Sequence, residues 1–421
     1  MAYTTIDKPT DYVQCIGWTT AGTNSSGHLD TYTLTTNFGW IPDMFLHYNR
    51  GDAIHILAPF MHYNGSSGSQ RSSIQTDYSN LGKCELADDA PSYETGATGY
   101  ASAASTSAIT FTHGNHGDAG GSSKGVHFKQ TDGTFTGLAW RFTTATGGTS
   151  LTTTTAGDVD GVCCVGADTG MSLVTYNSNG NGVDETVAHG LTGYNPNLKW
   201  LIPVSRRGAS DNRYWISNND GTDHDQSYRY SKGWGKSENF DDMNSGAMMW
   251  GISGGGGEPQ EQYTQTTHTR LGHHNHGTRQ SGAYAGENII DYAFLWARNV
   301  QGFSQYGCFE GNGNADGPFV FCGFKPAIVF IDLVGPTSAD KIGLMYDNIA
   351  DWGNDINPVS YPREMGVGAA SSSGQEIDYL SNGFKVRSSD EQVNKDATRY
   401  AYWAWAERPF IDSAGNPAPA H

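Results

Sequence analysis

A motif that occurs three times constrains the fold of this chain more than any other feature of its sequence. In each copy an aromatic residue stands two positions before a proline, and an apolar segment of strand length follows. The copies are WIPDMFLHY at 40–48, YNPNLKWLIPV at 194–204 and FKPAIVFIDLV at 324–334. Proline lacks a backbone N–H but is tolerated at the first position of a strand, so each copy predicts a turn and then a strand. Repetition at this scale indicates a chain built from similar units.

A strand-like segment that ends in Gly and Asn residues precedes each copy of the motif. These segments are IGWTTAGTNSSG at 16–27, LVTYNSNGNG at 173–182 and GCFEGNGNADG at 307–317. Gly and Asn readily adopt positive φ, so the segments predict tight hairpins.

A tryptophan-bearing segment closes each unit. The three segments are TFTGLAWRF at 134–142, DYAFLWAR at 291–298 and YAYWAWAE at 400–407. When Trp140, Trp296 and Trp405 are aligned, a bulky residue stands two positions earlier in every copy. Spacing of two places both bulky side chains on one face of a strand, so we predict three equivalent strands.

The composition agrees with strands rather than helices. The chain has 421 residues, of which 55 are glycine, and it lacks long Leu-, Ala-, Glu- and Lys-rich stretches of helical period. We expect an all-β fold of three tandem β-sandwich domains, jelly-roll or lectin-like, with few short helices. The predicted domains span 1–145, 146–300 and 301–421. The Thr- and Gly-rich segment 144–161 is predicted to be a linker, and residues 412–421 a flexible tail.

Charge and cysteine content exclude some classes of protein. There are 43 Asp and Glu residues against 25 Lys and Arg, a net charge of −18, which argues against nucleic acid as a partner. No apolar run reaches the ~18 residues of a membrane-spanning helix, and MAYTTIDKPTDY lacks the pattern of a secretory signal. We therefore expect no membrane insertion and reduced, mostly buried cysteines. The cysteines are Cys15, Cys84, Cys163, Cys164, Cys308 and Cys322.

Several longer segments resemble one known family. They are MAYTTIDKPTDY, MSLVTYNSNGNGVDETVAHGL, GFSQYGCFEGNGNADGPFVFCGFKPAIVFI, YLSNGFKVRS and YAYWAWAERPF. They are similar to tandem-domain structural, tail fibre-like virion proteins of tailed bacteriophages, especially marine ones. The resemblance covers nearly the whole chain, is strongest from Gly302 to Phe410 and is weaker in the first unit. It implies a virion component, assembled in the host bacterial cytoplasm, with no known enzymatic activity.

From this we expect a non-enzymatic tail fibre or tail-associated appendage that contacts a glycan or protein of the host surface and other virion proteins. Such appendages are commonly homotrimers, so we expect a homo-oligomer, with a trimer favoured. The first alternative is a head or collar decoration or fibre protein with an architectural role. The second is a glycan-cleaving tailspike enzyme, which requires two carboxylates facing a sugar ring. No local motif singles out such a pair, and no catalytic residue or cofactor is expected.

Histidines recur in two of the units as His-x-Asn-His-Gly, at 113–117 and 273–277. Duplication of the unit explains the near copy, and Asn-His-Gly suits an exposed turn. The alternative is a metal site, since His274 and His276 would share a face if they lie on a strand. Three such pairs on a three-fold axis would give a nitrogen-rich octahedral site. We expect the exposed turn rather than a metal site. If a metal does bind, the candidate ligands are His274 and His276.

Other short matches to functional motifs are incomplete. Ser253 lies in a Gly-x-Ser-x-Gly pattern, but GGGGEPQ cannot readily begin the helix that a nucleophile elbow needs. Gly235-Lys236-Ser237 lacks the leading glycine of a phosphate loop. Residues 218–225 offer oxygen ligands for calcium without the spaced loop and bidentate Glu.

Aromatic residues mixed with polar ones around turns are candidates for a binding surface. The alternative is that they pack in a core. We expect the adapted surface in the first or second unit, and the candidates in the second are Trp215, Tyr228, Tyr230 and Trp234.

Overall fold

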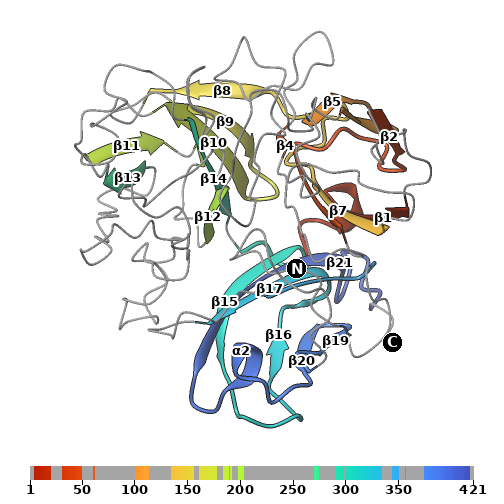
Figure 1. Cartoon of the computed structure of the whole chain (residues 1–421), viewed down its shortest axis with the longest axis vertical. Coiled ribbons are helices and arrows are strands. Elements are labelled where there is room, and N and C mark those ends of the chain that lie inside the picture. The colour runs from red at the N-terminus through yellow and green to blue at the C-terminus, as the bar shows by residue number, and fades with distance from the viewer. Residues whose placement is uncertain are drawn as a thin grey trace, which may run out of the picture.

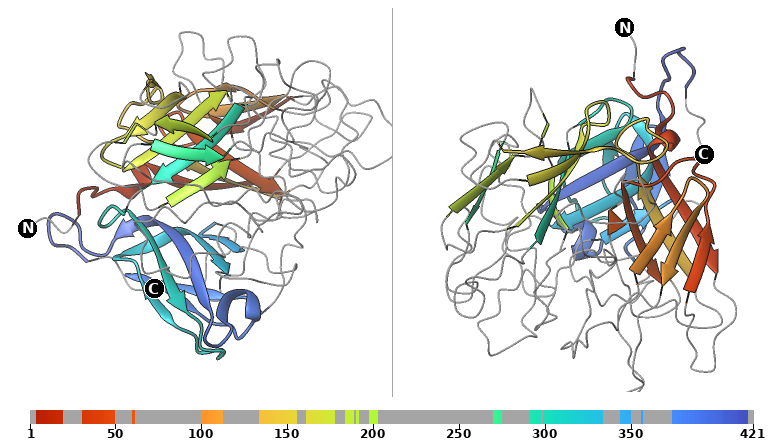
Figure 2. Two further views of the ribbon diagram at one scale, coloured as in Figure 1. Left: turned by 90° about the vertical axis from the view of Figure 1, so that its left-hand side faces the viewer. Right: turned by 90° about the horizontal axis from the view of Figure 1, so that it is seen from above.

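The part of the chain that the structure describes forms almost only antiparallel sheets (Figures 1 and 2). The computed structural model describes residues 4–19, 31–49, 60–61, 100–112, 134–155, 161–177, 184–188, 190–191, 198–202, 270–274, 291–297, 299–333, 344–349, 356 and 374–417. Within these ranges the helices are one 3₁₀ turn, η1 (Pro9–Asp11), and one α-helical turn, α2 (Glu391–Asn394). The prediction of an all-β fold with few short helices is confirmed. No helix among the described residues is long and apolar enough to cross a membrane.

Three larger sheets share one arrangement at their centre. The tryptophan-bearing strand lies between the opening strand and the strand that follows the proline motif, antiparallel to both. The first sheet has the order β1 (Val13–Thr19), β7 (Thr134–Trp140), β3 (Met44–Asn49), β4 (Phe60–Met61). The second has β12 (Leu198–Ile202), β14 (Asp291–Ala297), β10 (Met171–Asn177), β9 (Gly161–Gly166), β8 (Leu151–Thr154). The third has β15 (Ser304–Glu310), β21 (Arg399–Pro409), β17 (Phe324–Leu333), β18 (Leu344–Asp347).

Three smaller sheets also repeat one pattern. In each, the strand that follows the opening strand pairs with the described strand that precedes the closing one. Their orders are β2 (Thr31–Thr35), β6 (Ala108–Thr112), β5 (Tyr100–Ala104); then β11 (Asp184–Ala188), β13 (Arg270–His274); then β16 (Phe319–Phe321), β20 (Gly383–Val386), β19 (Ile377–Leu380). We call β1–β7 the N-terminal sheet pair, β8–β14 the middle sheet pair and β15–β21 the C-terminal sheet pair.

The predicted tight hairpins are wrong. After β1, β10 and β15 the chain does not turn back beside the same strand but passes to the smaller sheet, where β2, β11 and β16 begin. In the third copy, where the structure describes it in full, the Gly- and Asn-rich segment 311–317 connects the two layers, while most of the Gly and Asn residues of the first two copies lie outside the described residues. The physical reason is that two layers are needed to enclose a core, so the strand after each opening strand is placed in the other layer.

Apolar side chains fill the space between the layers. In the C-terminal sheet pair, Val329 and Ile331 of β17 pack in one cluster with Phe384 of β20 and Ile377 of β19. In the N-terminal sheet pair, Phe45 and Ala139 pack with Leu34 and Ile109 of the smaller sheet. Alternate residues of each strand point into these clusters, as the period of two requires.

The opposite faces of the larger sheets are buried as well. On β17, Ile328 and Phe330 alternate with the core residues and are 0% and 1% exposed. On β7, Leu138 and Trp140 are both 0% exposed. The indole rings of Trp140 and Trp405 meet edge to face, with centroids 5.4 Å apart. The N-terminal and C-terminal sheet pairs therefore share a second apolar layer, and the three sheet pairs surround the middle of the molecule (Figure 1).

The middle sheet pair is joined to the N-terminal one by hydrogen bonds around a buried carboxylate. Asp43 accepts from the backbone N–H of Phe142 and of Thr149, both at 2.6 Å, and from the Thr149 hydroxyl at 2.7 Å. Burial raises the pKa of Asp43, and these donors oppose that shift. The Thr169 hydroxyl donates to the Phe142 carbonyl at 2.9 Å. At Gly166 a Cβ would lie 1.9 Å from the same carbonyl oxygen, so only glycine fits this approach.

Strand register corrects the alignment of the tryptophans. The first residues of the equivalent strands β1 and β15 lie opposite Trp140 and Trp405, but the first residue of β10, Met171, lies opposite Ala297. Trp296 is therefore one residue out of alignment. A shift of one residue moves a side chain to the other face of a sheet. The prediction that the three segments are strands at one place in the topology is confirmed, but the residue equivalent to the two tryptophans is the buried Ala297.

Two segments expected to be irregular contain structure. Part of the predicted linker forms strand β8, which pairs with β9. The first residues of the predicted tail form a turn in which Asp412 accepts from the backbone N–H of Asn416 at 2.7 Å. The backbone N–H of Ser413 donates to Asp7 at 2.8 Å, so the segments near the two ends of the described chain are in contact.

The described cysteines are free thiols. Cys163, Cys164 and Cys322 are buried, and Cys15 and Cys308 are partly buried. Cys84 lies outside the described residues.

The tryptophan contact is tested by a double-mutant cycle. We expect Trp140→Ala and Trp405→Ala each to lower the free energy of unfolding by about 3–5 kcal/mol, because each removes a fully buried indole. The double variant should lose about 0.5–1.5 kcal/mol less than the sum, since the two rings contact each other. Urea unfolding monitored by circular dichroism measures all four stabilities. Additive losses would contradict direct packing between the two sheet pairs.

Candidate functional site

Most of the residues that the sequence singled out lie outside the described residues. These are the aromatic candidates, His276, the histidines at 113 and 116, Ser253, the phosphate-loop match at 235–237 and the oxygen-rich segment 218–225. The aromatic candidates are Trp215, Tyr228, Tyr230 and Trp234. His274 is the last residue of β13 and lies opposite Asp184 of β11 in the strand register. Among the described residues no group of three or more His, Cys, Asp or Glu side chains could hold a metal ion.

The two histidine segments occupy equivalent places in the fold. The first follows β6 directly, and the second begins on β13, the strand equivalent to β6. In the C-terminal sheet pair the corresponding strand is β20, which is followed by Arg387 and Ser388. This location agrees with duplication of a unit as the origin of the histidine motif.

An exposed aromatic pair that the sequence analysis missed lies on the outer face of the C-terminal sheet pair. Phe319 and Phe321 of β16 are 45% and 60% exposed, while Val320 between them is buried in the core. Residues two apart on a strand share a face, so both rings project from one side of the smaller sheet. Opposite Phe321 lies Gly383, where a Cβ would be 2.0 Å from the Val320 carbonyl oxygen. No side chain can stand there, so glycine is required where β16 and β20 approach closely.

The fold does not require aromatic residues at these two positions. In the equivalent strand β2, buried Leu34 pairs with Ile109 as Val320 pairs with Phe384. The neighbours of Leu34 on the outer face are exposed threonines, Thr33 and Thr35. One topology therefore carries hydroxyls in the N-terminal copy and phenyl rings in the C-terminal copy. Exposed apolar groups that the fold does not need indicate a contact with something else.

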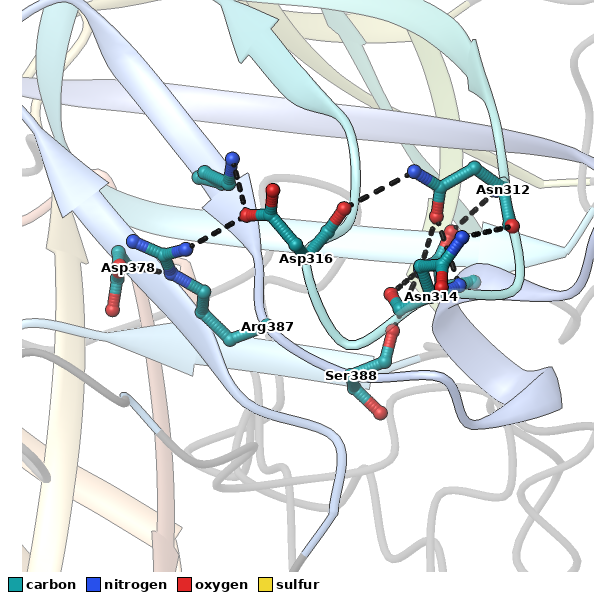
Figure 3. A network of polar contacts seen from close by, with 8 residues as sticks. Asn312, Asn314, Asp316, Asp378, Arg387 and Ser388 are labelled. Carbon is teal, nitrogen blue, oxygen red and sulfur yellow. Dashed lines mark hydrogen bonds and ion pairs between the residues drawn. The ribbon is translucent and has the colours of Figure 1, made fainter.

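Charged side chains border the phenylalanines. Lys385 lies opposite Phe319 on β20, and its ammonium is 2.7 Å from the carboxylate of Asp316. Arg387 lies 3.1 Å from the same carboxylate, and its Nε bonds to the buried Asp378 (Figure 3). The bond to Lys385 holds the pKa of Asp316 below its usual range. The two cations are thereby kept in defined positions beside the aromatic pair.

The loop that carries Asn312, Asn314 and Asp316 (Figure 3) is held from inside by Asn394 of α2. The amide nitrogen of this fully buried residue donates to Asn312 Oδ1 at 3.0 Å, to the Asn314 carbonyl at 2.7 Å and to the Ser388 carbonyl at 2.6 Å. Its amide oxygen accepts from the Asn312 N–H at 2.8 Å. Asn312, Asn314 and Asp316 have the alternate spacing of calcium ligands, but Asn312 Oδ1 accepts from Asn394 and the Asn314 N–H, and Asp316 binds two cations of the chain.

The helical turn itself is held against the larger sheet. Asp390 caps α2 by accepting from the Gln392 N–H at 2.7 Å. The Tyr400 hydroxyl of β21 donates to the Glu391 carbonyl at 2.6 Å and accepts from the Lys395 N–H at 2.7 Å. Burial raises the pKa of Tyr400 to about 12. Strand β21 thus positions Asn394, and Asn394 positions the loop.

One family model matches most of the chain, residues 69–409, and its description is "Domain of unknown function (DUF7483)". The chain belongs to this family. The match to the DUF7483 family includes the whole aromatic pair, its charged border and the Asn394 anchor. No curated protein and no solved structure matches the chain.

The anchor is tested by Asn394→Asp, which keeps the shape of the side chain but replaces the NH2 group, which faces three acceptor oxygens, by a carboxylate oxygen. We expect a loss of about 2–4 kcal/mol in the free energy of unfolding. Hydrogen exchange of the amides at 312–317 should also become faster. Unchanged exchange in this loop would contradict the anchoring role of Asn394.

The ion pair is tested by titration of Asp316. A lowered pKa in the folded state means that the carboxylate stays charged as pH falls below the ordinary aspartate range. The contact with Lys385 is then lost only as pH passes through the lowered value. Carboxyl NMR should show a midpoint below 3.8 in the wild type and a higher midpoint in Lys385→Ala. Equal midpoints would show that Lys385 does not cause the shift.

Proposed function

We propose that the chain is a non-enzymatic structural component of a bacteriophage virion, a tail fibre or tail-associated appendage that contacts the host surface. The observation that carries this proposal is the repeated strand topology, with two of its three copies in contact through the apolar faces of their larger sheets. Such a body is a rigid support from which surface loops and strands can be presented to a partner. The sequence resemblance to tail fibre-like virion proteins supports the same role.

In this proposal the three sheet pairs are three tandem β-sandwich domains of the jelly-roll or lectin-like kind, with boundaries near 145 and 300. Two antiparallel layers around an apolar cluster, as in the N-terminal and C-terminal sheet pairs, support this assignment. The proposed partners are other virion proteins and a glycan or protein of the host surface. The location is the virion, after assembly in the host cytoplasm.

The homotrimer predicted from the resemblance stays a prediction. At their buried positions, strands β7, β17 and β21 of the first and third larger sheets are covered on both faces within one chain, whereas the edge strands β1 and β15 are partly exposed. An interface between copies would therefore use other surfaces, such as the outer faces of the smaller sheets.

Labelling of intact particles tests the proposed function. Gold-conjugated antibodies raised against this chain should decorate the distal tail, and the same antibodies should block adsorption to host cells. Gold over the head or collar would replace the proposal by the architectural alternative. Particles that carry no gold, while denatured particles react with the antibody on a blot, would place the epitopes inside and contradict an exposed appendage.

A separate assay addresses the tailspike alternative. Incubation of folded protein with host surface polysaccharide should release no reducing sugar. Release of reducing ends would make the protein an enzyme and contradict the non-enzymatic part of the proposal.

A further inference from the structure

We propose that the outer face of β16 and β20 is a carbohydrate-binding surface, on which Phe319 and Phe321 stack against sugar rings and Lys385 and Arg387 donate hydrogen bonds to sugar hydroxyl or carboxylate groups. The ligand class is a polysaccharide chain. Its assignment to the bacterial cell surface rests on the proposed function, whereas its chemistry rests on the side chains themselves.

The aromatic pair has the geometry of a platform. At a rise of ~3.3 Å per residue, the two side chains leave the strand about 7 Å apart on the same face. The face of an aromatic ring is electron-rich and attracts the C–H bonds that line one side of many sugar rings. Two neighbouring rings on one face of a strand can therefore contact successive residues of an extended chain.

The charged border supplies directional contacts. An ammonium has three N–H donors and a guanidinium has five. Lys385 is 24% exposed at its side chain and Arg387 is 37% exposed, so both reach solvent while their carboxylate partners hold them in place. Groups that are already ordered lose little entropy when they bind a ligand. This arrangement suits hydroxyl or carboxylate groups of a sugar beside the stacked rings.

The size of the apolar patch favours a glycan over a protein partner. A stable protein interface buries roughly 800 Å² on each partner around an apolar centre. The only other large hydrophobic residue exposed among the described residues is Ile349. Ile349 follows the C-terminal end of β18 in the larger sheet and lies beside Gly17 of β1. It is not on β16 or β20. The apolar area of two phenyl rings among polar side chains is closer to the small contact area of a polysaccharide chain.

The internal repeat supplies the variant and its control. Phe319→Thr with Phe321→Thr gives β16 the outer face that β2 already carries, with residues of high strand propensity. Thr33→Ala with Thr35→Ala makes the matching change on the N-terminal copy. Both proteins should unfold at temperatures close to that of the wild type, because the altered side chains point outward.

The experiment is a screen of the full chain on an array of immobilised bacterial capsular and lipopolysaccharide glycans, followed by calorimetric titration with the best binder. We expect the wild type and the threonine-to-alanine control to bind alike. The double phenylalanine variant should bind about tenfold more weakly or worse, since it loses two stacking contacts. Lys385→Ala should weaken binding as well.

Three outcomes would overturn the inference. The wild type could bind no glycan on the array, the double phenylalanine variant could bind as well as the wild type, or that variant could instead lose binding to a purified virion protein. The last result would make the surface a protein interface. Antibody labelling is independent of these results. Gold on the tail without glycan binding removes only this inference, and glycan binding without gold on particles removes only the proposed function.

Discussion

The edge-to-face contact between Trp140 and Trp405 is the interaction on which the arrangement of the molecule depends. It joins the closing strands of the first and third larger sheets through faces that a lone sandwich would leave in water. Neither indole N–H has a hydrogen-bond partner among the described residues, so the contact is stabilised by apolar packing and ring geometry. Burial of this second face turns a series of repeats into a single body.

The repeat could be predicted from the sequence because its elements have local causes. Proline at a strand start and period-two spacing before a tryptophan depend only on neighbouring residues, and both led to the observed strands. The layer change after each opening strand could not be read in this way, since glycine and asparagine permit a hairpin and a longer connection equally. The misalignment of Trp296 has the same origin. Register is set by pairing across strands, and only that pairing shows that Ala297 takes the place of a tryptophan.

The candidate surface was harder to predict. The sequence PFVFCG contains the alternation that places Phe319 and Phe321 on one face, but it does not say whether that face is the core or the outside. The threonines of β2 decide the question, because they show that the outer face of an equivalent strand is polar. The anchor could not be predicted at all. Asn394 is about 80 residues from the loop that it holds, as the bond to Asn314 spans 80 positions.

The molecule combines a shared interior with one specialised outer surface. The buried second faces of the first and third larger sheets hold these two copies together. The outer faces of the smaller sheets can therefore differ between copies without cost to the fold. The N-terminal copy has a hydroxyl-lined outer face, and the C-terminal copy has an aromatic one with fixed cations beside it. This division of roles suits a structural protein that presents a binding surface from a rigid support.

Scanning calorimetry of the intact chain tests the shared interior most directly. If the sheet pairs form one body, unfolding should be one transition, with a ratio of calorimetric to van't Hoff enthalpy of about one. Separate transitions, or a ratio of about three, would show sheet pairs that unfold independently. That result would contradict the central claim that the three sheet pairs form one body, held by the apolar layer between the first and third larger sheets and by the hydrogen bonds around Asp43.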